Sequence, residues 1–215
     1  MLQRVVLHFA HMNQAPEVTA IDIPDLNMTN LKEPGTMHMK WTATDPNEDE
    51  LTFEVAIRKE GWNNWVTLAE HLGKAEYDLD SGTLPNGIYY LKVTASDRPD
   101  NPEDQAMASS MISSSFIVAH DNPVVVLRIM ERAQGRLQLQ ATATGTLARL
   151  ASAAYSLNGK SWIALFPTDR LFDSTKKTFR FSIPDPGRSA TLIMVRVKDA
   201  AGNLGSIDLM VPPLQ

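Results

Sequence analysis

Apolar residues recur at every second position along much of the chain, and not at the three- or four-residue spacing of a helix face. In the segment LKVTA, Leu91, Val93 and Ala95 fall on one side of an extended chain and the two polar residues fall on the other. This alternation predicts half-buried β-strands. Further strands of this type are expected at 36–43, 53–57, 64–68, 114–119, 136–143, 177–183 and 193–198.

Turn-forming residues separate the predicted strands. DPNEDE at 45–50, LPNG at 84–87, DRPDNPED at 97–104 and IPDPG at 183–187 are rich in Pro, Gly, Asn and Asp, and Asn158-Gly159 is a strong two-residue hairpin signal. No segment predicts a long helix. Many short strands at regular spacing are typical of β-sandwiches and barrels.

The same order of strands and turns is found twice. The segments 53–68 and 154–165 both read as strand, tight turn and a second strand that begins at a tryptophan, and 84–97 aligns with 184–199. A break at AHDNPVVV, residues 119–126, lies between the two copies.

The expected organisation is therefore a tail from a preceding domain and two domains. We expect the tail at 1–14, a first sandwich at 15–119 and a second at 120–215.

Composition removes several classes of function. The formal charge of −5 argues against nucleic acid and anionic membranes as partners, because both need a basic surface. The absence of cysteine excludes disulfides, thiolate zinc sites and cysteine nucleophiles. No apolar run reaches the roughly 20 residues of a membrane span, and the N-terminal stretch lacks the features of a signal peptide. We interpret the chain as a fragment of a longer exported protein, extracellular or periplasmic.

Several motifs in the first half resemble fibronectin type III and immunoglobulin-like domains. APEV opens an edge strand, Trp41 lies in the strand WTATDP, and LPNGIYYLKV places Tyr89 where these folds carry a corner tyrosine. The resemblance implies two facing sheets that pack around a buried indole.

The second half is similar to bacterial Ig-like repeats with a V-x-V-x-D-x-x-G-N signature, here VRVKDAAGN at 195–203. It differs from the first half in having Thr191 where Tyr89 stands, and Gln140 or Ala141 where Trp41 would be. Together the two resemblances imply an all-β chain of two tandem immunoglobulin-like, fibronectin type III-like β-sandwiches, of the kind found at the C-terminal end of larger exported bacterial proteins.

Asp199 lies at the end of a predicted strand, three residues before the Gly202-Asn203 pair of a turn. A carboxylate in that position accepts hydrogen bonds from backbone N–H groups of the turn, and Gly202 and Asn203 tolerate the positive φ that such turns use. We predict that Asp199 closes a corner, and that Asp97 does the same in the first half.

The alternative chemistry is calcium. Acidic and amide side chains on the loops offer the hard oxygen ligands that Ca²⁺ prefers. Asp45-x-Asn47-x-Asp49 starts like an EF-hand loop, but Glu50 stands where that loop needs glycine. No cofactor is predicted; if a calcium site exists, its candidate ligands are Asp45, Asp97, Asp100 and Asp121.

No catalytic motif is present. The five histidines lack metal-ligand spacing, and the chain contains no HExxH, GxSxG or phosphate-binding glycine loop. Ser174-x-x-Lys177 matches S-x-x-K, but it reads as a solvated polar loop. We predict that the chain is not an enzyme.

Trp62 is the candidate contact residue. It lies in the polar turn KEGWNN, three residues before Trp65, which we expect to face the core together with Trp41. An exposed indole can stack on a sugar ring or anchor a protein partner. The alternative is that Trp62 covers the edge of its own sandwich, since isolated surface aromatics are common.

The predicted function is a non-catalytic binding or spacer module of a larger exported bacterial protein, with an unidentified protein or glycan partner. The alternative is a carbohydrate-binding accessory region of a glycoside hydrolase or a similar enzyme.

Overall fold

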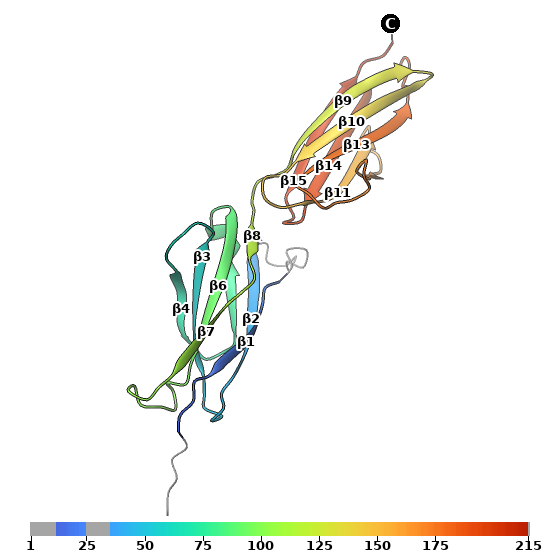
Figure 1. The fold of residues 1–215 in the computed structure, drawn as a ribbon. Coiled ribbons are helices and arrows are strands. Elements are labelled where there is room, and N and C mark those ends of the chain that lie inside the picture. The colour runs from blue at the N-terminus through green and yellow to red at the C-terminus, as the bar shows by residue number, and fades with distance from the viewer. Residues whose placement is uncertain (1–11, 25–34, 215) are drawn as a thin grey trace, which may run out of the picture. The chain divides into compact units, whose positions relative to one another are not determined.

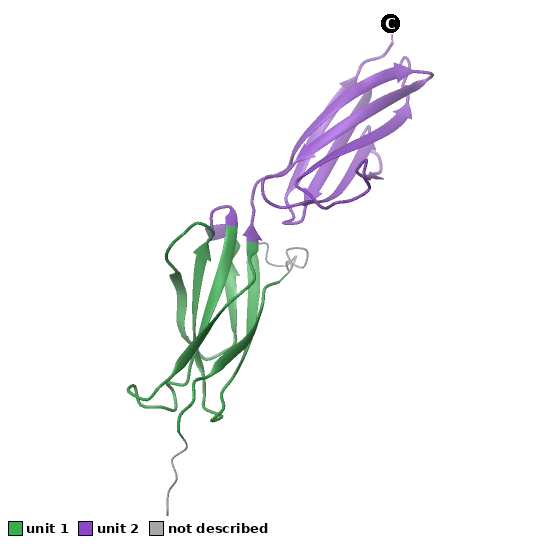
Figure 2. Cartoon of the chain, viewed as in Figure 1, with its two compact units in different colours: residues 1–24, 29–81, 88–116 green, residues 25–28, 82–87, 117–215 purple. Residues whose placement is uncertain are grey.

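The chain forms two compact units, each built from β-strands. The structure is a computed structural model that describes residues 12–24 and 35–214. The first unit takes in the described residues up to 81 and residues 88–116, and the second takes in 82–87 and 117–214 (Figure 2). No helix among the described residues is long and apolar enough to cross a membrane.

The first unit contains two antiparallel sheets (Figure 1). One has the strand order β1-β2-β5, and the other has the order β4-β3-β6-β7, with β8 also paired to β6. The strands are β1 (Glu17–Asp22), β2 (Thr36–Thr44), β3 (Thr52–Lys59), β4 (Val66–Leu72), β5 (Glu76–Asp80), β6 (Gly87–Ser96), β7 (Ala108–Ile112) and β8 (Phe116–Val118). The first residue of β6 and the last two residues of β8 fall beyond the boundary of this unit given above.

The second unit has the same arrangement, with a sheet of order β9-β10-β13 and a sheet of order β12-β11-β14-β15. The strands are β9 (Val124–Ala133), β10 (Arg136–Thr144), β11 (Leu150–Leu157), β12 (Ile163–Leu165), β13 (Lys176–Pro184), β14 (Thr191–Asp199) and β15 (Leu204–Val211).

In both units a three-stranded sheet takes the first, second and fifth strands, and the remaining strands form the other sheet. The prediction of two immunoglobulin-like, fibronectin type III-like sandwiches is confirmed by this strand order. The strands expected at 36–43, 136–143, 177–183 and 193–198 appear close to their predicted bounds, because alternating burial is the signal that sheets with one solvated face leave in a sequence. The strand expected at 64–68 lies at 66–72, the one expected at 114–119 is shorter, and β5 and β7 were not expected.

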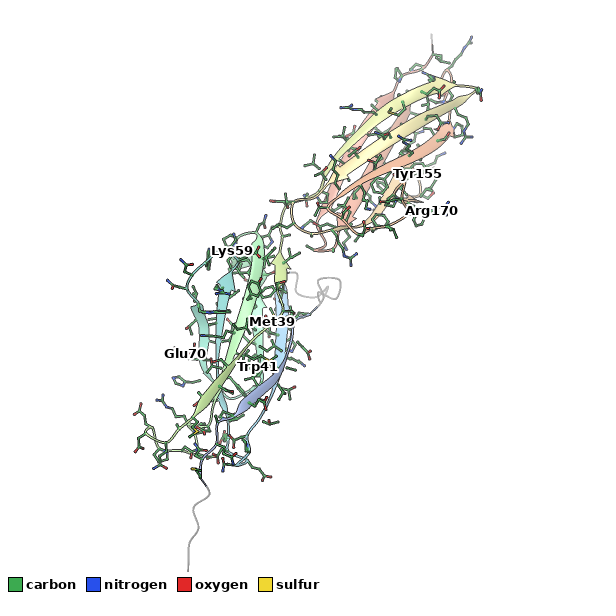
Figure 3. All side chains as sticks on the ribbon, viewed as in Figure 1. Met39, Trp41, Lys59, Glu70, Tyr155 and Arg170 are labelled. Carbon is green, nitrogen blue, oxygen red and sulfur yellow. The ribbon has the colours of Figure 1, made fainter. Side chains whose placement is uncertain are left out.

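The core of the first unit lies between its two sheets. Met39 and Trp41 on β2 are fully buried or nearly so (Figure 3), and Trp41 meets Phe53 of the other sheet edge-on, with ring centroids 5.4 Å apart. Tyr89, the predicted corner tyrosine, is completely buried and stacks on Phe116. Burial raises its phenol pKa.

The second core is more aliphatic. Phe179 and Ile183 of β13 are buried against Ile193 and Val195 of β14 within one hydrophobic cluster. Thr191, which aligns with Tyr89, is 8% exposed and lies at the start of β14. A hydroxyl therefore replaces an aromatic ring at this position, and the two units fill their cores with different side chains.

The Asn158-Gly159 turn is confirmed. Both residues have positive φ, 53° and 70°, which is the combination that a type I′ hairpin turn requires. The amide of Lys160 donates to the carbonyl of Leu157 at 3.0 Å and closes the turn between β11 and β12.

Trp65 is not a core residue, contrary to the prediction. It lies one position before β4 and is only partly buried. The guanidinium of Arg58 is 4.8 Å from the centre of its ring and the amine of Lys92 is 5.4 Å from it. The indole therefore packs against cations on the outer face of the sheet, where cation–π attraction replaces burial in the core.

The chain preceding β9 lies against the start of β15. The side-chain amide of Asn203 donates to the carbonyl of Ala119 at 3.0 Å. At Gly205 the approach is so close that an added Cβ would lie 1.8 Å from the carbonyl oxygen of Pro123. Only glycine fits at that position.

Candidate functional site

The described polar groups converge most closely at one end of the first unit. Asp45 follows the last residue of β2, Asp49 lies three residues before β3, and Asp97 follows the last residue of β6. Because β3 and β6 pair with Thr52 opposite Ser96, the loops that carry Asp49 and Asp97 meet at the same edge. Asn13 reaches this edge from the segment before β1.

Asp45, Asp49 and Asp97 together form the acidic cluster. Each contributes a carboxylate oxygen, and these three oxygens lie within 4.8 Å of one another. Asp97 has no solvent exposure, and the other two are partly buried. In the part of the chain that the structure describes, these are the residues that bring three metal-ligand atoms together.

Hydrogen bonds hold the cluster in place. Asp97 accepts one bond from the amide of Met107, at 2.6 Å, and one from the side-chain amide of Asn13, at 2.7 Å. The Oδ1 atom of Asp45 accepts the amides of Asn47 and Asp49, at 2.7 and 3.3 Å.

Two further oxygens at the cluster are left without a donor. Asp45 Oδ2 and Asn13 Oδ1 are both screened from solvent, and neither has a hydrogen-bond partner. Buried acceptors without partners are rare in folded proteins, so each calls for an explanation.

The structure separates the four residues proposed as calcium ligands. Asp45 and Asp97 lie in the cluster, which also contains Asp49. Asp100 accepts the backbone amide of Glu50 at 2.6 Å and lies outside the group of three. Asp121 belongs to the second unit, where it accepts the side-chain amide of Asn86 at 2.7 Å.

Asp199 closes the corner predicted for it. It is 3% exposed, and its Oδ1 accepts the backbone amide of Asn203 at 2.9 Å while its Oδ2 accepts the side-chain amide of the same residue at 3.0 Å. Gly202 has a φ of 94°, as the turn requires. Asp199 is thus a structural residue, and its counterpart Asp97 differs because two more carboxylates lie beside it.

Trp62 lies on the turn between β3 and β4, as predicted, and is 43% exposed. One edge of its ring meets Tyr89, with centroids 6.3 Å apart. The indole is therefore partly covered by its own unit, and its exposed part faces solvent.

A second exposed indole lies in the second unit. Trp162, 39% exposed, has the guanidinium of Arg196 4.2 Å from the centre of its ring. Lys198 and Leu204 line the same surface hollow. The sequence analysis placed Trp162 and Trp65 at equivalent strand starts but did not propose Trp162 as a contact residue; that equivalence is the signal that could have pointed to it.

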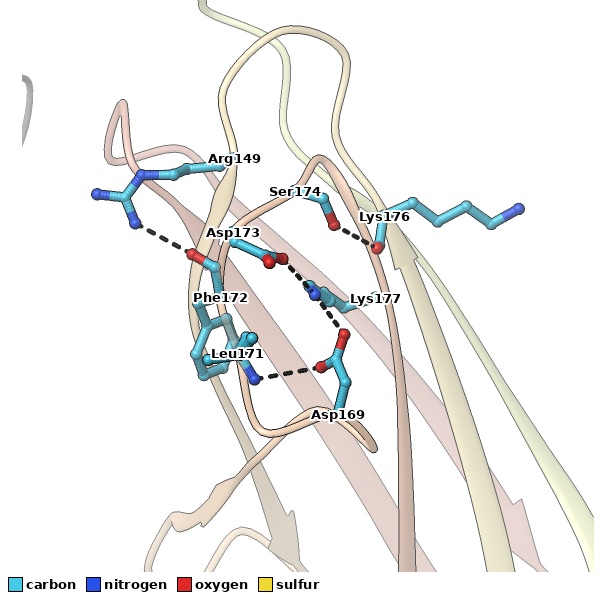
Figure 4. Close-up of polar contacts among 8 residues, drawn as sticks. All are labelled: Arg149, Asp169, Leu171, Phe172, Asp173, Ser174, Lys176 and Lys177. Atoms are coloured by element: carbon cyan, nitrogen blue, oxygen red, sulfur yellow. Dashed lines mark hydrogen bonds and ion pairs between the residues drawn. The ribbon is translucent and has the colours of Figure 1, made fainter.

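The S-x-x-K match does not open a helix: Ser174 is exposed in the loop before β13, as expected, but Lys177 is not solvated. Lys177 lies on β13 with its side chain 6% exposed, and its amine contacts Asp169 at 2.6 Å and Asp173 at 2.5 Å (Figure 4). The hydrogen bonds that Lys177 donates to Asp169 and then to Asp173 raise the pKa of Lys177, and the bond from Lys177 lowers the pKa of Asp169. These ion pairs tie the loop before β13 to the sheet, and the hydroxyl of Ser174 donates to the carbonyl of Lys176.

No protein-family model matches the chain, and no curated protein matches it. Among solved structures, the FN1–FN3 domains of chicken CNTN1 are similar at 13% identity and a TM-score of 0.35, over 94% of this chain and 69% of that chain. The assignment of the fold rests on the strand orders described above.

Proposed function

We propose that the chain is a non-catalytic binding or spacer module of a larger exported bacterial protein. The observation that supports the proposal is that buried polar side chains stabilise turns and loops. Asp199 closes a turn, and Lys177 with Asp169 ties down a loop. Neither group faces a reactive neighbour of the kind that nucleophilic or acid–base catalysis needs.

Exposed aromatic side chains are the candidates for recognition. Trp62 and Trp162 expose 43% and 39% of their area, and each belongs to a different unit. Indoles are over-represented among residues that dominate protein interfaces, and they also stack on sugar rings. Either indole could therefore anchor a partner while the sandwiches act as rigid carriers.

A carbohydrate-binding accessory region is the second candidate, and the half-exposed Trp62 is the observation that favours it. The two candidates differ in the ligand, since a spacer or protein-binding module has no need of a sugar.

The proposal is tested with the purified chain. We expect no turnover of a panel of glycans, esters and peptides, and turnover that a single substitution abolishes would contradict the proposal. On a glycan array and on insoluble polysaccharides, binding that falls at least about tenfold in Trp62→Ala would favour the accessory-region candidate.

The control variant is Met130→Ala, which removes an exposed apolar side chain from β9 of the other unit. Its binding should equal that of the wild type. Trp62→Ala should remain folded, with a change in the free energy of unfolding below about 1 kcal/mol, as is usual for surface substitutions. Loss of folding in Trp62→Ala would show that this indole supports the core.

A further inference from the structure

We propose that the first unit binds one Ca²⁺ ion at the acidic cluster, with oxygens of Asp45, Asp49 and Asp97 as ligands and the side-chain oxygen of Asn13 as a fourth. This inference does not depend on the proposed function.

The carboxylates of the acidic cluster lack a positively charged partner. The cluster places three carboxylates together, and Asp97 is completely buried. Within the described residues, none of the three forms an ion pair with Lys, Arg or His. Buried charges in proteins are paired or coordinate metals, because isolated ones are too costly to remove from water. A cation between the carboxylates would supply the missing positive charge.

Two side-chain oxygens at the cluster lack a hydrogen-bond donor, and this observation is independent of the carboxylate spacing. Asp45 Oδ2 and Asn13 Oδ1 are fully screened from solvent and unpartnered. The Asn13 amide nitrogen bonds to Asp97 and the Asp45 Oδ1 atom bonds to the Asp49 amide, so both orphan oxygens belong to side chains fixed at the cluster. Oxygens that lack a hydrogen-bond donor are suited to a metal ion.

The identity of the ion follows from the ligands. All the available atoms are oxygens, which calcium and magnesium prefer, whereas zinc favours nitrogen and sulfur. Calcium–oxygen distances are about 2.4 Å, so two ligands on opposite sides of one calcium ion are about 4.8 Å apart. The three carboxylate oxygens lie within that limit. Magnesium requires a shorter distance and near-octahedral geometry, which irregular loops seldom supply.

The site would join three parts of the first unit that are far apart in the sequence. Asn13 precedes β1, Asp45 and Asp49 flank the β2–β3 loop, and Asp97 follows β6. Calcium would therefore stabilise the folded first unit by binding it and not the unfolded chain.

The experiment is a thermal melt and a calorimetric titration of the full chain, first freed of metal with EDTA and then given CaCl₂ or MgCl₂. We expect one calcium per chain, and a rise in Tm on the order of 10 °C when calcium reaches about 100 times its Kd. Magnesium should give a smaller rise at equal concentration.

Asp49→Asn is the first variant, because Asp49 is partly exposed and its removal leaves the Asp97 contacts intact. We expect at least about a tenfold weaker calcium affinity and loss of most of the Tm rise. Asp45→Asn is the second variant and should behave in the same way. Asp104→Asn is the control: it makes the same chemical change at an exposed position of the loop that follows β6, and it should keep the wild-type response.

Three results would overturn the proposal. The first is the absence of any heat or Tm change in the wild type at up to about 10 mM calcium, a concentration above the weakest range of extracellular calcium modules. The second is an equal calcium response in Asp49→Asn and Asp104→Asn. The third is a stoichiometry far above one calcium per chain. Any of them would leave the cluster as a loop closed by hydrogen bonds alone.

Discussion

Asp199 illustrates how a single carboxylate fixes a turn. It is nearly fully buried, and both of its oxygens bond to the same residue, Asn203, through the backbone amide and the side-chain amide. Asn203 in turn reaches the carbonyl of Ala119. Removal of the carboxylate therefore leaves two donors of Asn203 without their acceptor.

We expect Asp199→Ala to lower the free energy of unfolding by about 1 to 2 kcal/mol, through the lost hydrogen bonds. Urea denaturation of the full chain measures the change. The matched control is Asp208→Ala on β15, where the side chain is exposed and the change should be below about 0.5 kcal/mol. Equal effects of the two substitutions would contradict the role of Asp199 as a corner.

At the scale of elements, Lys177 links β13 to the loop that precedes it. The loop carries Asp169 and Asp173, and both carboxylates contact the amine of a side chain that is itself buried. The pKa of Asp169 is lowered, so its contribution to stability is present above its unfolded pKa and is lost as pH falls through the folded value. The pKa of Lys177 is raised, so its contribution is present below its unfolded pKa and is lost as pH rises through the folded value.

We therefore expect the difference in Tm between the wild type and Asp169→Asn to be constant from about pH 6 to pH 9 and to shrink as the pH falls below about 4, where the carboxylate loses its charge. Asp208→Asn, which removes an exposed charge from β15, should show no such pH-dependent difference. A difference that persists unchanged at pH 3 would mean that Asp169 acts through packing and not through its charge.

The elements themselves could be read from the sequence for a physical reason. Each sheet has one buried and one solvated face, so β6 alternates strictly between buried and partly buried residues. Strands without that contrast were harder to find: β7 has no fully buried residue and was not expected, and β4, which has none either, was expected at 64–68 but runs to Leu72. Trp65 was wrongly predicted to face the core, because a tryptophan that packs on Arg58 and Lys92 gives the same alternation of apolar and polar residues in the sequence as a tryptophan in the core.

At the scale of the whole molecule, the candidate cation site could be predicted only in part. The loops and their acidic character were visible, but Asp45 and Asp97 are separated by half of the first unit, and only the pairing of β3 with β6 brings them together. Asn13 carries no charge and lies in a segment expected to be a tail, so its contact with Asp97 had no sequence signal.

The close approach of Pro123 to Gly205 has a practical consequence for anyone who wishes to clone the second unit alone. The segment before β9 is part of that unit, since Ala119 accepts the Asn203 side chain and Pro123 lies against Gly205. A fragment that starts at residue 124 would expose Gly205 and remove the acceptor of Asn203. A fragment 117–215 should therefore express in soluble form and melt cooperatively, whereas 124–215 should melt at least several degrees lower. Indistinguishable melts of the two fragments would show that residues 117–123 can be discarded from an expression vector without loss.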